Sequence, residues 1–191
     1  PGLHIYHFAP YEPAAIKRLR SDKPRSAKAR ERFEWEVRAA SGLTHPNTIA
    51  IYDFGPTPDG GFYYAMEYLE GLDLQRLVDQ HGPLAAERVV FVVDQVLGSL
   101  AEAHRRGILH RDIKPSNLFL TERGGEFDFV KVLDFGLAQE IHAPAHSSGE
   151  STAPAGIIGT PLYMAPEVFY GKQPVDNRSD LYSLGAVAYF L

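Results

Sequence analysis

The sequence predicts an α+β protein of two lobes, a small β-rich lobe followed by a larger helical one. Strand-like runs and turn signals dominate residues 1–66, whereas the hydrophobic pattern of residues 72–191 is mainly helical. Residues 67–71 between them are interpreted as a hinge. Because two lobes joined by one strand leave a cleft at their junction, a ligand site is expected there.

The first lobe is predicted to be a small sheet with one helix. A strand-like run covers residues 14–19 and a charged helix covers residues 27–41, after which residues 44–47 break the helical pattern. Two further strand-like runs, 48–54 and 62–68, flank a segment rich in Gly and Pro that is typical of a tight hairpin turn.

The second lobe is predicted to be built on helices. A short helix runs to about residue 80, a Gly-Pro break follows, and a long apolar helix covers about residues 84–106. Residues 143–155, rich in Ser, Pro, Ala and His, are expected to form an exposed loop. Residues 181–191 are apolar almost throughout and predict a buried helix that we expect to continue beyond Leu191, because no capping signal ends it.

Composition excludes several classes of function. The net charge of −5 gives no electrostatic basis for binding nucleic acid. The absence of cysteine excludes disulfides and thiol chemistry and is compatible with the cytoplasm. The apolar run of residues 181–191 is too short to span a bilayer, so any membrane anchor is expected outside this segment. His142 and His146 have helical ligand spacing but lie in the Pro-rich loop without a carboxylate partner, so no histidine metal site is expected.

The most informative segment is His110-Arg111-Asp112-Ile113-Lys114-Pro115-Ser116-Asn117, which is followed by Asp134-Phe135-Gly136. These two motifs resemble the catalytic loop and the metal-binding motif of protein kinases. The resemblance extends from Ala14 to Leu191. It implies a bacterial eukaryote-like Ser/Thr protein kinase with the two-lobed protein-kinase fold, incomplete in its N-lobe and truncated in its C-lobe.

The resemblance also assigns catalytic roles. Phosphoryl transfer depends mainly on positioning and charge neutralisation, which suits carboxylates, an amide and a lysine. Asp112 would orient and deprotonate the substrate hydroxyl, and Lys114, which is typical of Ser/Thr-directed members, would pair with the transferred phosphate. Asn117 and Asp134 would supply oxygen ligands to Mg²⁺, or Mn²⁺, bound with ATP. Asp53-Phe54-Gly55 repeats the second motif without a catalytic loop before it and is interpreted as a turn that ends a strand.

Several residues of the first lobe are expected to bind the nucleotide. By the resemblance, Lys17 would contact the α- and β-phosphates, and Glu36 would hold Lys17 in place. Glu34 is the rival partner, since only one of the two can face the cleft. The resemblance also makes Met66 the gatekeeper behind the adenine, which the backbone amides of Glu67 and Leu69 would bind.

The segment from Gly159 to Glu167 resembles the end of a kinase activation loop. The expected phosphoacceptors lie earlier in the same loop, between Gly136 and Gly159. They are Ser147, Ser148, Ser151 and Thr152, of which Thr152 fits best by its distance from Gly159. A phosphate there would pair with Arg111 and order the loop. Structural roles in this region are implied for Gly136, Thr160 and Glu167, and for Asp180, which would brace the backbone of the catalytic loop.

The resemblance has gaps that leave alternatives open. The glycine-rich loop that covers the nucleotide phosphates is missing, which would suit an inactive pseudokinase or scaffold, although Lys17, Asp112 and Asp134 are all present. A second alternative is a small-molecule kinase of the aminoglycoside phosphotransferase kind. The segment from Gly159 to Glu167 argues against it, because those enzymes lack this segment. No feature of the sequence favours a third alternative, a protein that only senses nucleotide. The expected partners are therefore proteins with Ser or Thr acceptors, including a second copy during autophosphorylation.

Overall fold

The computed structural model of this 191-residue chain describes residues 4–7, 13–19, 37–57, 62–135, 161–170 and 175–191. Several of the residues singled out above lie outside this part of the chain: Glu34, Glu36, Gly136, His142, His146, Ser147, Ser148, Ser151, Thr152 and Thr160. The loop expected at residues 143–155 lies outside it as well.

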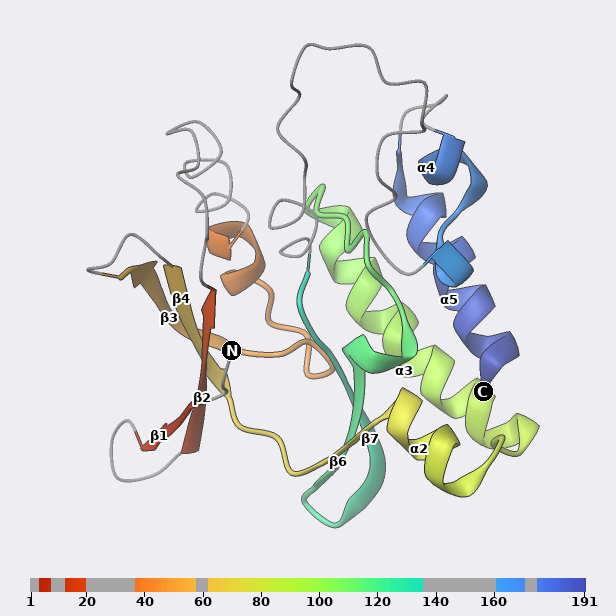
Figure 1. The fold of residues 1–191 in the computed structure, drawn as a ribbon, viewed down its shortest axis with the longest axis horizontal. Coiled ribbons are helices and arrows are strands. Elements are labelled where there is room, and N and C mark those ends of the chain that lie inside the picture. Colours follow the sequence, from red (N-terminus) through yellow and green to blue (C-terminus); the bar gives the residue numbers. More distant parts are fainter. Residues whose placement is uncertain (1–3, 8–12, 20–36, 58–61, 136–160, 171–174) are drawn as a thin grey trace.

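The first lobe contains an antiparallel sheet of four strands in the order β1-β2-β4-β3 (Figure 1). The strands are β1 (His4–His7), β2 (Pro13–Leu19), β3 (Ile51–Pro56) and β4 (Phe62–Glu67). Residues 37–41 are helical, and Val37 is fully buried against Tyr64 of β4. This helical segment therefore packs on the face of the sheet that carries Tyr64.

The strand predicted at residues 48–54 begins later, at Ile51, because its first residues pair with the other lobe. Thr48 forms a parallel bridge with Val132, and the amide of Ile49 donates to the Val132 carbonyl at 3.0 Å. The segment before β3 thereby ties the two lobes together.

The second lobe combines helices with a sheet that the sequence analysis did not predict. Three antiparallel strands, β5 (Gly71–Asp73), β6 (Leu118–Arg123) and β7 (Glu126–Val132), follow one another in that order. The helices are α2 (Leu74–His81), α3 (Ala86–Arg105), α4 (Pro166–Tyr170) and α5 (Asn177–Phe190). The first helix starts two residues later than expected because Asp73 ends β5 and caps α2, where its carboxylate accepts from the Arg76 amide at 2.9 Å.

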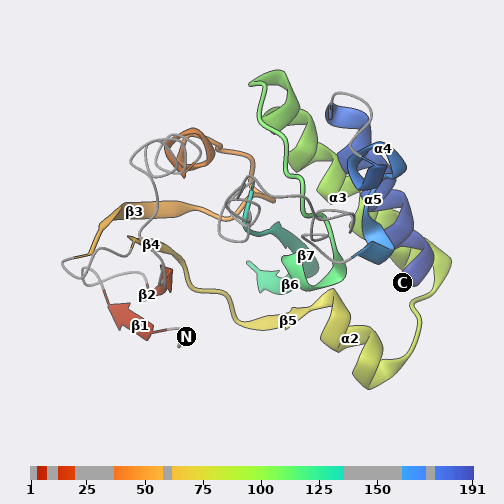
Figure 2. The ribbon, with the colours of Figure 1, turned by 45° about the horizontal axis from the view of Figure 1, so that its top comes forward.

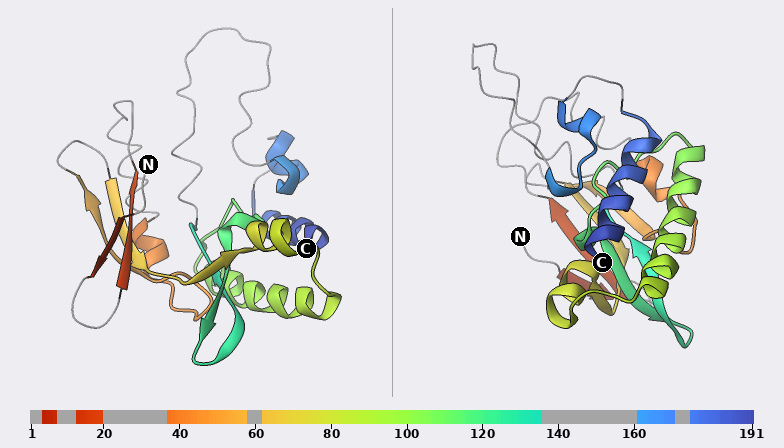
Figure 3. Two further views of the ribbon diagram at one scale, coloured as in Figure 1. Left: turned by 60° about the horizontal axis from the view of Figure 1, so that its bottom comes forward. Right: turned by 90° about the vertical axis from the view of Figure 1, so that its right-hand side faces the viewer.

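The main hydrophobic core lies in the second lobe around α3. Val92, Val96 and Leu100 of α3 are almost fully buried and belong to one cluster with Val132 of β7 and Val187 of α5. Figures 2 and 3 show α5 running alongside α3, and the connection from β4 to β5 leading from the first sheet to the helical lobe. Among the described helices, none has both the length and the apolar character that crossing a membrane requires.

Candidate active site

The three predicted catalytic residues converge in the loop between α3 and β6. The Lys114 ammonium lies 2.8 Å from Asp112 Oδ2, and Asn117 Nδ2 donates to the same oxygen at 3.0 Å and to the Asp112 carbonyl at 2.8 Å. Pro115 opens a 3₁₀ turn over Pro115–Asn117, which folds Asn117 back toward Asp112. Both hydrogens of the Asn117 amide face Asp112, so its carbonyl oxygen is the end able to meet a cation.

Asp180 of α5 holds the start of this loop. Its carboxylate accepts hydrogen bonds from the backbone amides of His110 at 2.9 Å and Arg111 at 2.8 Å, and it lies 2.8 Å from His104 Nε2. Arg111 has a backbone φ of 64°, a conformation that costs energy for any residue other than glycine. The buried carboxylate therefore stabilises a strained backbone beside Asp112, where the resemblance placed it.

Asp134 lies two residues after the end of β7 and is tied to the catalytic loop through its neighbours. The amide of Leu133 donates to the Asn117 carbonyl at 2.9 Å, and the Leu133 carbonyl lies 2.8 Å from His110 Nε2. The ring of Phe135 packs against the His110 ring, with centroids 4.7 Å apart. These contacts bring Asp134 and Asn117, the two predicted metal ligands, into one region.

His110 works here as a neutral hydrogen-bonding and packing residue. Burial lowers the pKa of His110 because it penalises the imidazolium form, and the carboxylate of Asp180 opposes that shift without cancelling it. The uncharged ring joins the catalytic loop to the segment that carries Asp134 and Phe135. No separate role for His110 was predicted from the sequence.

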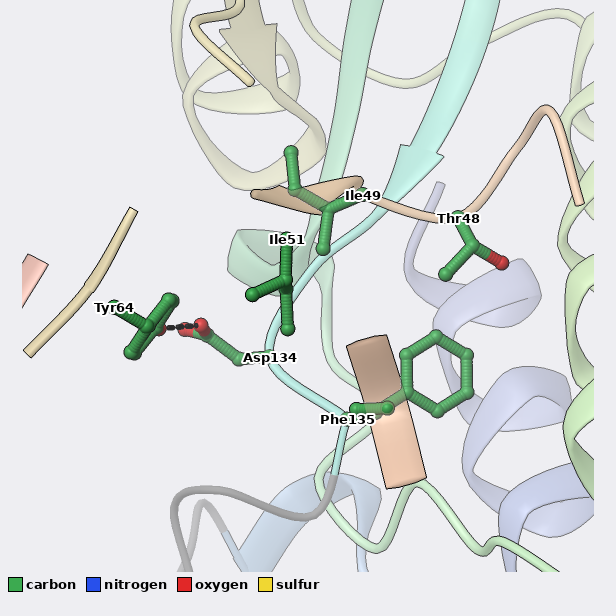
Figure 4. Close-up of a pocket in the computed structure, with 7 residues that line it drawn as sticks. Thr48, Ile49, Ile51, Tyr64, Asp134 and Phe135 are labelled. Carbon is green, nitrogen blue, oxygen red and sulfur yellow. Dashed lines mark hydrogen bonds between the residues drawn. The ribbon is translucent and has the colours of Figure 1, made fainter. Parts of the chain in front are cut away.

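The side chain of Asp134 is held from the first lobe. The Tyr64 hydroxyl donates a hydrogen bond to Asp134 Oδ1 across the junction between the lobes (Figure 4). Both residues line a small, mainly apolar recess. The other residues that line it are Ala40, Thr48, Ile49, Ile51 and Phe135. Tyr64 was not among the predicted site residues, since a tyrosine within an apolar strand is ordinary core material by its sequence pattern.

The ladder between β2 and β4 places Lys17 near this contact. Lys17 pairs with Tyr64 in the register of the two antiparallel strands. The backbone of the predicted phosphate-binding lysine therefore lies one strand away from the tyrosine that binds Asp134.

The predicted adenine contacts stay predictions, but the structure restricts how Glu67 could make one. The N–H of Glu67 donates to the Ala50 carbonyl at 3.0 Å, so this half of its backbone amide group is already engaged in a hydrogen bond within the protein. Leu69 lies in the connection between β4 and β5, outside both ladders, and Met66 packs beside Val37 and Tyr64. The roles of Leu69 and Met66 stay predictions.

The side chain of Glu67 connects its strand to other parts of the protein. It accepts from the Ala50 amide at 2.9 Å and pairs with Lys131 of β7 at 2.6 Å. Further along the chain, Glu167 of α4 accepts from the Ser179 hydroxyl at 3.0 Å. Both carboxylates thus connect separate elements of the fold.

The donor atoms of the site fit a hard cation bound together with phosphates. Asp112, Asn117 and Asp134 offer only oxygen, which Mg²⁺ prefers, and Mg²⁺ is commonly held by one or two carboxylates plus phosphate oxygens. In the part of the chain that is described, no three His, Cys, Asp or Glu residues cluster as a metal site of their own. The oxygen donors of Asp112, Asn117 and Asp134 suit a divalent cation that phosphate oxygens help to hold.

Comparison with known proteins identifies the family. Residues 4–191 match the family model of the protein kinase domain. The chain belongs to the protein kinase family. Its relatives include the Ser/Thr-protein kinase pkn3 of Myxococcus xanthus, 47% identical over 84% of this kinase chain and 29% of the relative. Another is the Ser/Thr-protein kinase PknB of Mycobacterium tuberculosis, 39% identical over 98% of this chain and 30% of the relative.

Solved structures agree with that assignment. The PknI kinase domain of M. tuberculosis superimposes with a TM-score of 0.74 at 30% identity, covering 98% of this kinase chain and 65% of that domain. The predicted two-lobed kinase fold is thereby confirmed. The chain spans about a third of the length of these two curated relatives, and about two thirds of the solved kinase domain.

Proposed function

We propose that the protein containing this chain transfers the γ-phosphoryl group of ATP to Ser and Thr hydroxyls of proteins. The observation that carries the proposal is the convergence of Asp112, Lys114 and Asn117 beside the segment that bears Asp134. The names of the relatives, all Ser/Thr-protein kinases, support the same reaction. Because ATP is supplied in the cytoplasm, we propose that this segment works there.

In this mechanism Asp112 is the general base. Its carboxylate would accept the proton of the substrate hydroxyl as that oxygen bonds to the γ-phosphorus and the bond from the γ-phosphorus to the bridging oxygen breaks. Lys114, 2.8 Å from Asp112, would stay close enough to neutralise charge on the transferred group. Mg²⁺, when bound with ATP, supplies further neutralisation, and Asn117 and Asp134 are the residues that would hold it.

The proposal extends to the activation loop. Thr152, Ser151, Ser148 and Ser147 are the candidate acceptors for autophosphorylation in a transient complex of two copies. Arg111, adjacent to Asp112, is the proposed partner of the resulting phosphate. Mass spectrometry after incubation with ATP tests this part, because phosphate on none of the four hydroxyls would contradict it.

The deciding experiment is the Asp112→Asn substitution in the full-length protein. We expect transfer of labelled phosphate to a generic Ser/Thr substrate to fall by at least about 100-fold, because a general base typically contributes that much or more. Nucleotide affinity should stay within about threefold of the original. Transfer at the original rate would contradict the proposed mechanism.

Asp176→Asn provides the matched control. It makes the same chemical change at an exposed carboxylate that caps α5 and pairs with Arg178. Asn caps helices as well as Asp does, so the fold should be retained. This variant is expected to transfer phosphate at the original rate.

A further inference from the structure

Two consecutive tyrosines of β4 each bind the aspartate of an Asp-Phe-Gly tripeptide. The Tyr63 hydroxyl donates to Asp53 Oδ2 at 2.8 Å on the exposed side of the sheet. The Tyr64 hydroxyl donates to Asp134 Oδ1 on the side that faces the second lobe. Because successive residues of a strand point to opposite faces, the same chemical contact occurs once outside the site and once inside it.

Tyr64 is built into the protein as a fixed donor. Its side chain is 1% exposed and packs with Val37 of the neighbouring helical segment. A tyrosine hydroxyl can donate one hydrogen bond, and the buried packing of this ring fixes the direction in which the hydroxyl points, toward Asp134.

Asp134 needs support of this kind. Its φ of 56° lies in the left-handed region, which is unfavourable for residues other than glycine and persists only where neighbouring contacts enforce it. Phe135, 3% exposed, fixes the backbone on one side of this residue. As Figure 4 shows, Tyr64 meets the carboxylate from the opposite side of the recess.

The hydrogen bond is compatible with metal binding by the same carboxylate. A carboxylate offers about four acceptor positions, and one hydroxyl uses one of them. In metal sites generally, outer partners of this kind orient a ligating carboxylate, and their loss commonly weakens metal binding or activity by about 10- to 100-fold.

We propose that the Tyr64 hydroxyl is a positioning residue that holds the Asp134 carboxylate in the orientation in which it receives the divalent cation of the metal-nucleotide complex. The proposal rests on the proposed function, because it assumes that Asp134 binds that cation. It adds a residue from β4 of the first lobe to a metal site whose proposed ligands, Asn117 and Asp134, lie in the second lobe. The hydrogen bond from Tyr64 would then link the position of the first lobe to the orientation of the metal ligand.

The test is a metal titration with Tyr64→Phe in the full-length protein. Binding of a fluorescent ATP analogue is measured while Mn²⁺ or Mg²⁺ is raised from zero. We expect the metal concentration for half-maximal binding to rise about tenfold or more in Tyr64→Phe, whereas the metal-free affinity for the nucleotide stays within twofold. In the transfer assay, the same variant should approach the original kcat when the metal is saturating, a recovery that general structural damage would not produce.

Tyr63→Phe is the matched control, since it removes the same hydroxyl from the neighbouring residue and the same bond to an aspartate. Its metal dependence should equal that of the original protein. Tyr64→Met is a second variant without a donor and of different shape, and it should show the same metal defect as Tyr64→Phe. Thermal melting in the absence of metal verifies that each variant is folded.

The outcomes separate this proposal from the proposed function. If the original protein binds metal-nucleotide and Tyr64→Phe matches Tyr63→Phe, the positioning role is overturned while the kinase activity stands. Tighter metal binding in Tyr64→Phe would also overturn it, because the hydroxyl would then compete with the metal. If the original protein shows no metal-dependent binding of nucleotide, both proposals fall.

Discussion

The ammonium group of Lys131 lies 2.6 Å from Glu67 Oε1 and joins the last residue of β4 to a strand of the other lobe. The side chains are 7% and 18% exposed, and Lys131 also donates to the Thr48 carbonyl at 3.3 Å. The pair therefore sits at the hinge between the lobes, largely shielded from water.

Removal of Lys131 should destabilise the protein. We expect Lys131→Met to lower the free energy of unfolding by about 2 to 3 kcal/mol, because Glu67 would be left with an uncompensated, mostly buried charge. The double variant Lys131→Met/Glu67→Gln should lose less than the two single variants added together. Urea unfolding of Lys131→Met, Glu67→Gln and the double variant measures these changes in the free energy of unfolding. Arg178→Met is the control, since its ion pair with Asp176 is exposed and should contribute about 0.5 kcal/mol or less.

Asp180 should be needed for the stability of the catalytic loop. Asp180→Ala leaves the buried amide of His110 and the partly buried amide of Arg111 without their acceptor, which we expect to cost about 2 to 4 kcal/mol. The melting temperature of Asp180→Ala should be several degrees below that of the original protein. Asp180→Asn keeps one acceptor oxygen, so its melting temperature should lie between those two values. A melting temperature for Asp180→Ala equal to that of the original protein would show that the loop holds itself without α5.

Stability should fall in acid partly through Glu102 of α3. Burial raises the pKa of Glu102, but hydrogen bonds from the His45 and Thr44 amides and the Thr44 hydroxyl, with the Arg106 charge, outweigh it and hold the pKa below 4.5. Because the unfolded chain then binds the proton more readily, this contribution is complete above about pH 4.5 and is lost as the pH falls through the lower folded-state pKa.

The measurement is urea unfolding at a series of pH values between about 6 and 3. Glu102→Gln should be less stable at pH 6 and lose less stability on acidification. Asp94→Asn, at an exposed position of the same helix, should keep the slope of the original protein. Equal slopes for Glu102→Gln and the original protein would contradict the assignment.

Gly71 should tolerate no side chain. Its φ is 147°, and a Cβ atom there would lie 2.0 Å from the Leu120 carbonyl oxygen of the paired strand. We expect Gly71→Ala to cost about 3 kcal/mol or more, because β5 must move away from β6. Gly107→Ala, at a φ of 73° where α3 ends and with no described atom within 4 Å of the added carbon, should cost only about 1 kcal/mol. Similar melting temperatures for the two variants would contradict the close approach of the strands.

Local chemistry made the catalytic loop predictable. Asp112, Lys114 and Asn117 lie within six residues of one another, and Pro115 closes the turn that brings them together. Strand β5 escaped prediction because it has only three residues, too few to show the alternation that identifies a strand. The start of β3 was misplaced because Thr48 and Ile49 pair with β7 instead of with a neighbour in the sequence.

The sequence by itself determined the family, the two lobes and the identity of the polar residues around Asp112 and Asp134. These features depend on residue types at short spacing, which the order of the chain records directly. Only the tertiary structure decided that Tyr64 binds Asp134, 70 residues away, and that Glu67 meets Lys131 across 64 residues. Such partners are chosen by the packing of separate elements, and their types are common enough in strands and on surfaces that spacing alone does not select them.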